Sequence, residues 1–247
     1  MTEPASVPVE IGWHPDSEQA ALAFPPPEPL TEAERAALGP PVTATDVLAN
    51  RLIRIPAAFD ARIRITGPGV VPVQFMRIEE EGALTEEAFQ GLFTRLEPTA
   101  QRRRERPVLQ LSLNLFFVTE EPCSLMLMAP FASPAFRDWP GTLVAGRFPA
   151  RAWPRVLNAA LEWEDRGRDW VIRRGESLAY VAFGFDDPAK VPRLVEAATT
   201  PALRRQFARV ADVVSFGRNV GPMFERAERS RPARLLVAKR TGAQGWD

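Results

Sequence analysis

The chain has 247 residues, of which 45% are apolar and 25% are charged, so it is long enough to bury a large hydrophobic core. Its 31 basic and 31 acidic residues balance, and this zero net charge gives no electrostatic reason to expect nucleic acid or an anionic membrane as a partner. The single cysteine, Cys123, excludes an intrachain disulfide and any zinc site with several cysteine ligands.

The sequence predicts neither a signal peptide nor a helix that spans a membrane. The first residues lack a basic segment followed by an apolar core, so no signal peptide is predicted. No apolar run approaches the roughly 18 residues that a bilayer-spanning helix needs. We therefore expect a cytoplasmic protein without a membrane partner.

Residues 1–49 are predicted to form a proline-rich arm. The prolines between positions 25 and 29 favour extended polyproline geometry over packed structure. Large apolar side chains are nevertheless present in the arm, at Ile11, Trp13, Leu22 and Phe24. We expect the arm to lie against the domain or against a neighbouring subunit. It contains one short helix, with Thr31 as N-cap, Glu34 as its capping-box partner and Gly39 past the end.

Residues 50–79 are predicted to form strands, because apolar and charged residues alternate there. Prolines at positions 56, 68 and 72 place these strands at sheet edges or bends. A helix is then predicted from Thr85, its N-cap, to about Leu96. Its buried stripe is formed by Phe89, Leu92, Phe93 and Leu96. The basic run at residues 101–107 is interpreted as a solvated connector.

The segment from Val108 to Gly184 carries the clearest strand signals. Leucines alternate with polar residues in the first half of Val108–Val118, which is the period of a half-buried strand. Further apolar runs are predicted as strands at residues 123–131, 142–148, 155–163 and 170–183. The run at 155–163 also suits a helix, and a strand is favoured because loop residues follow it. In the last run, a turn at residues 173–176 is predicted to close a hairpin.

Helices are predicted to dominate after residue 186. A short helix is expected at residues 191–198, a longer one from Thr200 to about residue 217 and a last one near Pro222 to Arg229. The fold class is therefore α+β: an antiparallel β-sandwich or jelly-roll-like core with one inserted helix and C-terminal helices. Residues 50–247 are expected to form one β-rich domain, with the helical cap at about 186–230.

The only histidine, His14, restricts the enzyme classes open to the chain. His14-Pro15-Asp16 has the H-x-D spacing of iron- and 2-oxoglutarate-dependent oxygenases, but their metal site needs a second histidine. A Ser-His-Asp triad would have to recruit His14 from the arm. No glycine-rich phosphate loop is present, and Cys123 lies in an apolar run as a buried, inert thiol. No metal or cofactor is predicted.

Acidic groups remain available at the ends of predicted strands. They are residues 79–81, Glu120 and Glu121, Glu162, Glu164 and Asp165, and Asp186 and Asp187. Two of them meeting across a sheet could form a magnesium or general acid–base site, although solvated turns also place acids there. The sequence selects no pair.

Tryptophan and arginine residues interleave between positions 139 and 173. The candidate ligand-binding residues are Trp139, Arg147, Trp163, Trp170 and Arg173. Both residue types anchor pockets and interfaces, whereas core packing is the alternative role of large aromatic residues in a β-domain.

Three segments of the central region carry a resemblance to known families. They read TEEPCSLMLMAPF at 119–131, GTLVAGRF at 141–148 and DWVIRRGESLAYVAFGF at 169–185. Over about residues 108–185 the chain resembles an uncharacterised family of bacterial and tailed-phage β-domains, which implies a fold and no activity. The closing hairpin is also similar to that of dUTP pyrophosphatase-like β-domains. Residues 141–148 lack the acid and the tyrosine of the uracil pocket in those enzymes, so the resemblance does not imply their catalysis.

Two functional hypotheses of different classes follow, and whether the protein is an enzyme stays open. The first is a non-enzymatic structural or accessory protein that acts through a protein partner or self-association, with the arm and the tryptophan- and arginine-rich loops as contact surfaces. The alternative is a small-molecule enzyme or a ligand-binding β-sandwich, with strand-end carboxylates such as Glu162 or Asp165 near a pocket lined by tryptophan and arginine.

Overall fold

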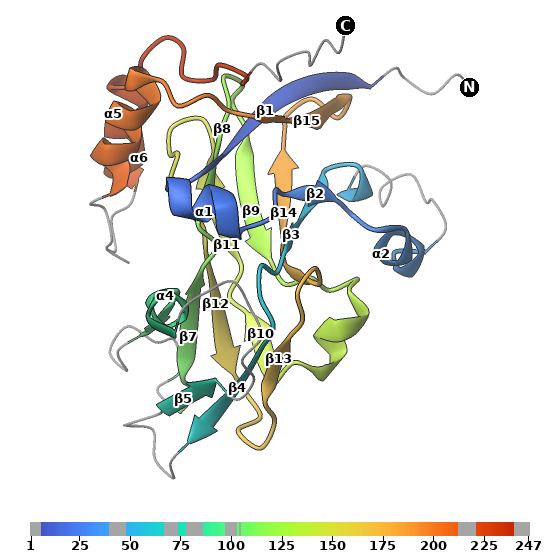
Figure 1. Ribbon diagram of the computed structural model, residues 1–247. Coiled ribbons are helices and arrows are strands. Elements are labelled where there is room, and N and C mark those ends of the chain that lie inside the picture. The colour runs from blue at the N-terminus through green and yellow to red at the C-terminus, as the bar shows by residue number, and fades with distance from the viewer. Residues whose placement is uncertain are drawn as a thin grey trace, which may run out of the picture.

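The computed structural model describes residues 6–39, 48–66, 74–77, 86–96, 103, 105–211 and 221–239. These residues form a mixed α+β fold of mostly antiparallel sheets with few helices, which confirms the predicted class at this level (Figure 1). Within those ranges, no helix combines the length and apolar character needed to cross a bilayer.

Two larger sheets form the centre of the fold. The five-stranded sheet has the spatial order β11 (Gly146–Pro149), β9 (Ser124–Met128), β14 (Ser177–Gly184), β3 (Leu52–Pro56) and β2 (Glu28–Pro29). The four-stranded sheet has the order β10 (Gly141–Leu143), β12 (Asn158–Trp163), β7 (Val108–Ser112) and β6 (Phe93–Arg95). The ambiguous run at 155–163 therefore does contain a strand, as favoured from its sequence.

Two three-stranded sheets lie toward opposite ends of the molecule (Figure 1). One has the order β15 (Lys190–Glu196), β1 (Val7–Pro15) and β8 (Leu115–Val118). The other has the order β13 (Trp170–Ile172), β4 (Ala61–Thr66) and β5 (Gln74–Arg77). The strands predicted within residues 50–79 are thus confirmed, whereas Pro68, Pro72 and residues 79–81 lie outside the described residues.

The first part of the predicted arm is built into the fold. β1 lies between β15, with which it pairs in parallel, and β8, with which it pairs antiparallel. Ile11 is completely buried there, and Trp13 packs against the main core. After the short helix α1 (Glu18–Ala23), the helix α2 (Glu32–Ala37) begins with the predicted capping box of Thr31 and Glu34.

The predicted short helix at residues 191–198 is wrong, because most of it is the edge strand β15. Its register places Leu194 beside Ile11 of β1. Pro192 has no amide hydrogen to donate, and β15 tolerates this because, among the described residues, it has a neighbouring strand on one side only. Pairing with β1, which lies far away in the sequence, has overridden the local preference.

The predicted closing hairpin is also wrong, because the strands on either side of residues 173–176 belong to different sheets. β13 pairs with β4, whereas β14 pairs with β3 and β9. The turn packs against the corner between β3 and β4: Gly175 donates from its amide to the Ala57 carbonyl at 2.9 Å, and Ala57 donates to the Glu176 carbonyl at 2.8 Å. Two adjacent chain segments therefore bend together from one sheet into the next, with Gly175 at a φ of 81°.

A second bend divides the long run Val108–Val118 into β7 and β8. Asn114 has a φ of 52°, a left-handed conformation that asparagine adopts more readily than most residues. Its side-chain oxygen accepts a hydrogen bond from the Ser112 hydroxyl at 2.7 Å. The chain passes here from the four-stranded sheet into the sheet that contains β1.

The inserted helix is shorter than predicted. α4 spans Glu86–Gly91, and Phe93 already belongs to β6, where it pairs with Leu111. Phe89 and Leu92 are buried as predicted. Glycine at the helix end and the β-forming residues after it explain the early stop. The predicted N-cap, Thr85, lies outside the described residues.

The predicted C-terminal helices are confirmed as α5 (Pro201–Ala211) and α6 (Gly221–Arg229) within the described residues. The Thr200 hydroxyl accepts a hydrogen bond from the Leu203 amide at 3.1 Å, as expected of an N-cap. Beyond α6, Glu120 binds the tail by accepting from the amides of Leu235 and Leu236, at 2.6 and 2.7 Å. The tail is therefore packed against the domain.

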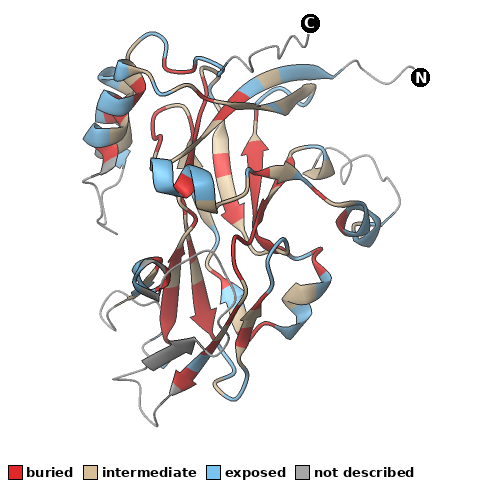
Figure 2. Cartoon of the chain, viewed as in Figure 1, coloured by how far each residue is buried: buried red, intermediate tan, exposed pale blue. Residues whose placement is uncertain are grey.

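Buried residues are concentrated along the strands of the two central sheets (Figure 2). One buried group is a carboxylate, since Glu34 is only 3% exposed. Its Oε1 accepts from the hydroxyls of Ser177 and Tyr180 at 2.6 and 2.7 Å, and its Oε2 accepts from Thr31. These hydrogen bonds attach α2 to β14. Burial alone would raise the pKa of Glu34, but the hydrogen bonds outweigh it and hold the pKa below its usual value.

Candidate ligand pocket

A pocket of about 400 Å³ lies where β9 and β11 of the five-stranded sheet approach β7 and β12 of the four-stranded sheet. Its apolar lining includes Phe117, Leu125, Leu127, Phe148, Trp153 and Leu157. Protein sites for small molecules have volumes of about 300–1,000 Å³ and predominantly apolar walls. The pocket therefore has the size and lining of a small-molecule site.

The two sheets contribute different kinds of wall. Leu125 and Leu127 belong to the main core, so β9 presents its inner face to the pocket. On β12, Ala159 and Leu161 also belong to that core, whereas the alternate residues Asn158 and Ala160 line the pocket. Side chains of a strand alternate between its two faces. The four-stranded sheet therefore presents to the pocket the face that is turned away from the core.

The connection between β11 and β12, residues 150–157, covers this outer face. Leu157 donates to the Leu115 carbonyl at 2.9 Å and accepts from the Leu113 amide at 2.9 Å, which fixes the connection to the bend between β7 and β8. Trp153 is buried and meets Phe224 of α6 edge to face, with ring centroids 4.9 Å apart. One side of the pocket is thus supported by α6.

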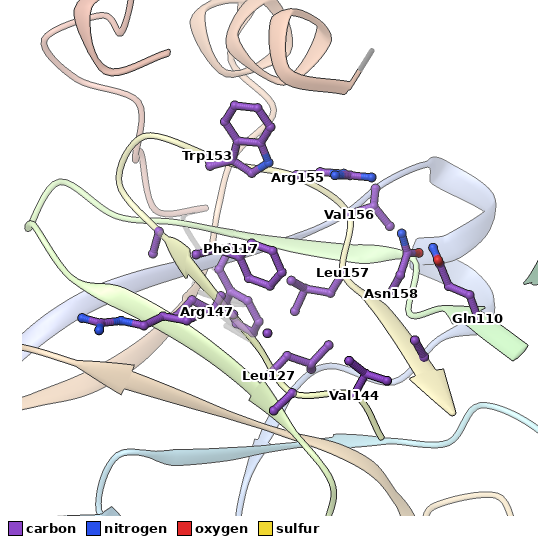
Figure 3. Close-up of a pocket in the computed structure, with 16 residues that line it drawn as sticks. Gln110, Phe117, Leu127, Val144, Arg147, Trp153, Arg155, Val156, Leu157 and Asn158 are labelled. Carbon is purple, nitrogen blue, oxygen red and sulfur yellow. The ribbon is translucent and has the colours of Figure 1, made fainter. Parts of the chain in front are cut away.

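Three polar side chains, Arg155, Asn158 and Gln110, lie on one side of the pocket (Figure 3). Asn158 pairs with Ser112, and Gln110 pairs with Ala160, so Asn158 and Gln110 are diagonal neighbours on one face of paired strands. All three are partly buried. Within the described residues, none of their side chains makes a hydrogen bond or an ion pair.

The charge of the pocket is positive. Arg155 and Arg147 both line it, and no acidic residue is among the described residues that do. Burial lowers the pKa of Arg155, because the charged guanidinium loses solvation and gains no counter-charge. Arg147 is more exposed and extends away from Arg155 (Figure 3). The partly buried cation of the pocket is therefore Arg155.

The structure separates the five ligand-binding residues suggested by the sequence. Trp139, Trp163 and Trp170 are all buried in the main core, and the rings of Trp139 and Trp170 meet edge to face at 5.2 Å. Arg173 is exposed in the turn at residues 173–176. Only Arg147 of the five lines this pocket. Core packing, the alternative role for these tryptophans, is the one that the structure shows.

Most of the acidic candidates bind to cations or backbone amides. Arg103 and Arg106 approach the buried carboxylate of Glu162, at 3.7 and 3.5 Å, and Arg106 also contacts Glu164 at 2.5 Å. Glu121 pairs with Lys190. In the described parts of the chain, no three histidine, cysteine or acidic side chains group as metal ligands would. These carboxylates are used to hold loops in place.

His14 is placed away from this pocket, beside α5. Its Nε2 lies 2.7 Å from the Thr199 hydroxyl, and its Nδ1 contacts the Pro15 carbonyl. The ring stacks on Phe116, with centroids 5.2 Å apart. His14 and Asp16 line a small cavity beside α5. Both ring nitrogens of His14 already contact Thr199 and the Pro15 carbonyl, so His14 does not link a serine to an aspartate as a catalytic triad requires. Burial raises the pKa of Cys123 to about 12, which makes its thiol inert at neutral pH.

The sequence contains part of the signal for the pocket residues. The alternation in Val108–Ser112 places Gln110 on the polar face of its strand, and the same rule places Asn158 opposite Leu157 and Ala159. Arg155 is one of several arginines near tryptophan residues, and nothing local distinguishes it. Only the tertiary structure places a loop over the polar face of the sheet.

Comparison of the chain with known protein families, with curated proteins and with solved structures found no match.

Proposed function

We propose that the protein binds a small molecule with an apolar body in the pocket between its two central sheets. The observation that carries this proposal is a 400 Å³ apolar pocket that is bordered by three polar side chains without partners in the described chain. Such a combination is the usual composition of ligand sites: apolar walls supply affinity, and a few polar groups orient the ligand. We also propose that the two central sheets pack as the layers of a β-sandwich, with the pocket at their edge, where the outer face of β12 and the inner face of β9 both contribute to its wall.

Binding of a small molecule is favoured over contact with a macromolecular partner because three of the four large apolar residues of the arm pack within the chain, whereas Leu22 is 91% exposed. Ile11 is buried between strands, and Trp13 and Phe24 pack against the core. These side chains suggested an external partner when only the sequence was considered. The packing of Ile11, Trp13 and Phe24 within the chain weakens that reason.

A neutral fluorescent probe, N-phenyl-1-naphthylamine, tests the proposal directly. We expect its emission to shift to the blue and to saturate at one probe per protein chain, because the pocket would transfer the dye from water to an apolar wall. Ala160→Phe should abolish this signal by filling the pocket from β12. A saturable signal that persists unchanged in this variant would place the dye elsewhere and contradict the proposal.

The matched control is Thr142→Phe. Thr142 is exposed on the neighbouring strand β10 and is not among the residues that line the pocket. It introduces the same side chain into the same sheet, so dye binding should be unchanged. Circular dichroism of both variants checks that the sheets have formed.

A further inference from the structure

The polar side of the pocket identifies the class of ligand, on the assumption of the proposed function that the pocket binds a small molecule. Arg155 lies at the end of the connection that covers the pocket, and Asn158 is three residues later at the start of β12. Gln110 joins them from β7. Figure 3 shows the three side chains on the same side, above and beside the apolar residues Leu157 and Val144.

All three side chains can donate hydrogen bonds. The guanidinium of Arg155 offers a planar fork of N–H groups, and each amide offers two N–H donors and one acceptor. The fork matches the two oxygens of a carboxylate. A half-buried cation without a counter-ion is also costly, because burial removes solvation that nothing replaces. An anion bound at this position would compensate the charge of the guanidinium and replace the lost solvation.

Acids of the protein itself do not fill this role. Glu162 and Glu164 lie at the far end of β12 and are bound to Arg103 and Arg106. No acidic side chain lines the pocket among the described residues. Within the described residues Arg155 has no carboxylate partner, and a bound anion would supply one.

The donor set is small, which distinguishes among anions. One guanidinium and two amides suit a singly charged group with two oxygens, whereas a phosphate carries more charge and three or more oxygens that require donors. Leu157 lies beside the polar group, and Phe117 and Leu127 line the pocket beyond it, so the apolar part suits a hydrocarbon or aryl body (Figure 3). The two parts of the pocket thus match the two parts of an amphipathic acid.

We propose that the ligand is an apolar monocarboxylic acid whose carboxylate binds Arg155, with Asn158 and Gln110 donating further hydrogen bonds and the hydrocarbon body lying against Phe117, Leu127 and Leu157. The charge pair forms at a partly buried position, where a charge-assisted hydrogen bond is stronger than at a fully exposed site.

The test compares an acid with its uncharged ester. Decanoic acid and methyl decanoate are titrated against the protein preloaded with N-phenyl-1-naphthylamine at pH 7.5. We expect the acid to displace the dye with a Kd at least about tenfold lower than the ester, which corresponds to about 1.4 kcal/mol. In Arg155→Met the ratio of the two Kd values should fall to about one, while the dye still binds. Arg155→Lys keeps the charge without the fork and should give an intermediate ratio.

Arg205→Met is the matched control, because Arg205 is exposed on α5 and lies outside the pocket. It should leave the ratio unchanged. Asn158→Ala should lower the ratio about threefold to fivefold, which corresponds to about 0.6–1 kcal/mol, the net contribution of one typical hydrogen bond.

Each other outcome overturns the proposal. The carboxylate proposal fails if the wild-type protein binds ester and acid equally, or if neither compound displaces the dye. Decyl phosphate that binds about tenfold more tightly than decanoic acid would assign the site to phosphate monoesters instead. In all these cases, binding of the dye still supports the proposal that the pocket binds a small molecule. If the dye does not bind, the proposed function itself is contradicted, together with the proposal that the ligand is a carboxylic acid.

Discussion

The buried carboxylate of Glu34 and the partly buried guanidinium of Arg155 show opposite ways of placing a charge inside this fold. Both oxygens of Glu34 accept hydrogen bonds, from the hydroxyls of Ser177 and Tyr180 and from Thr31. Arg155 has no such partner within the described residues. The first charge therefore stabilises the fold, whereas the second is costly until something binds it.

A charge that the fold leaves without a partner indicates where a ligand can bind, even where no catalytic motif is recognised. Glu120 and Arg231 repeat the pattern of Glu34: Arg231 contacts Glu120 at 2.5 Å, and its guanidinium also donates to the Arg151 and Thr119 carbonyls. Arg155, Asn158 and Gln110 have no side-chain partner among the described residues and lie together. This grouping, rather than any motif, identifies the pocket.

Removing the Glu34 carboxylate should have the largest effect on stability. Glu34→Ala leaves the Ser177 and Tyr180 hydroxyls buried without an acceptor, so we expect the free energy of unfolding to fall by about 3 kcal/mol. Urea denaturation measures this loss. Glu32→Ala on the exposed side of α2 is the control and should change stability by less than about 0.5 kcal/mol. Equal effects of the two variants would show that the Glu34 hydrogen bonds do not stabilise the fold.

Glu120→Ala should have the second largest effect. It removes the acceptor of the Leu235 and Leu236 amides and the partner of Arg231, and we expect a loss of about 2 kcal/mol. Limited proteolysis should then cleave the C-terminal tail earlier than in the wild type. Glu10→Ala removes an exposed ion pair with Arg193 and should change neither measurement appreciably. Unchanged proteolysis of Glu120→Ala would contradict the role of Glu120 in holding the tail.

Lowering the pH should reduce the stability that Glu34 contributes by less than Glu34→Ala does, because a protonated carboxyl group retains its shape and one acceptor oxygen. The pKa of Glu34 is lower in the folded than in the unfolded chain, so its contribution is complete above the unfolded pKa of about 4.3. It is lost as the pH falls through the folded pKa. Glu34→Gln should therefore flatten the dependence of stability on pH below pH 5. If the stability of Glu34→Gln depends on pH below pH 5 in the same way as that of the wild type, Glu34 is not the group that causes this dependence.

Arg155→Met should have the smallest effect and the opposite sign. It replaces an unpaired, partly buried cation with an apolar side chain, so the free protein should become more stable by about 0.5 kcal/mol, or stay unchanged. Urea denaturation without any ligand tests this. A loss above about 1 kcal/mol would mean that Arg155 serves the fold, and the contrast with Glu34 would no longer hold.

Local sequence patterns determined much of the secondary structure of this protein. The alternation in Val108–Ser112 predicts a half-buried strand, and Thr31 with Glu34 predicts the start of α2, because both depend only on residues close in the chain. The helix α5 follows from Thr200, Pro201 and one apolar face in the same way. The α+β class follows from these elements together.

The places where these elements meet depend on contacts between residues that are far apart in the sequence. Residues 191–198 have the composition of a helix, yet pairing with β1 makes most of them a strand, and no nearby residue carries that information. The strands around Gly175 diverge because the turn bonds to Ala57, more than a hundred positions earlier. The pocket has the same origin: the sequence contains Arg155, Asn158 and Gln110, but only a connection folded over the outer face of a sheet makes them neighbours and partly buries them.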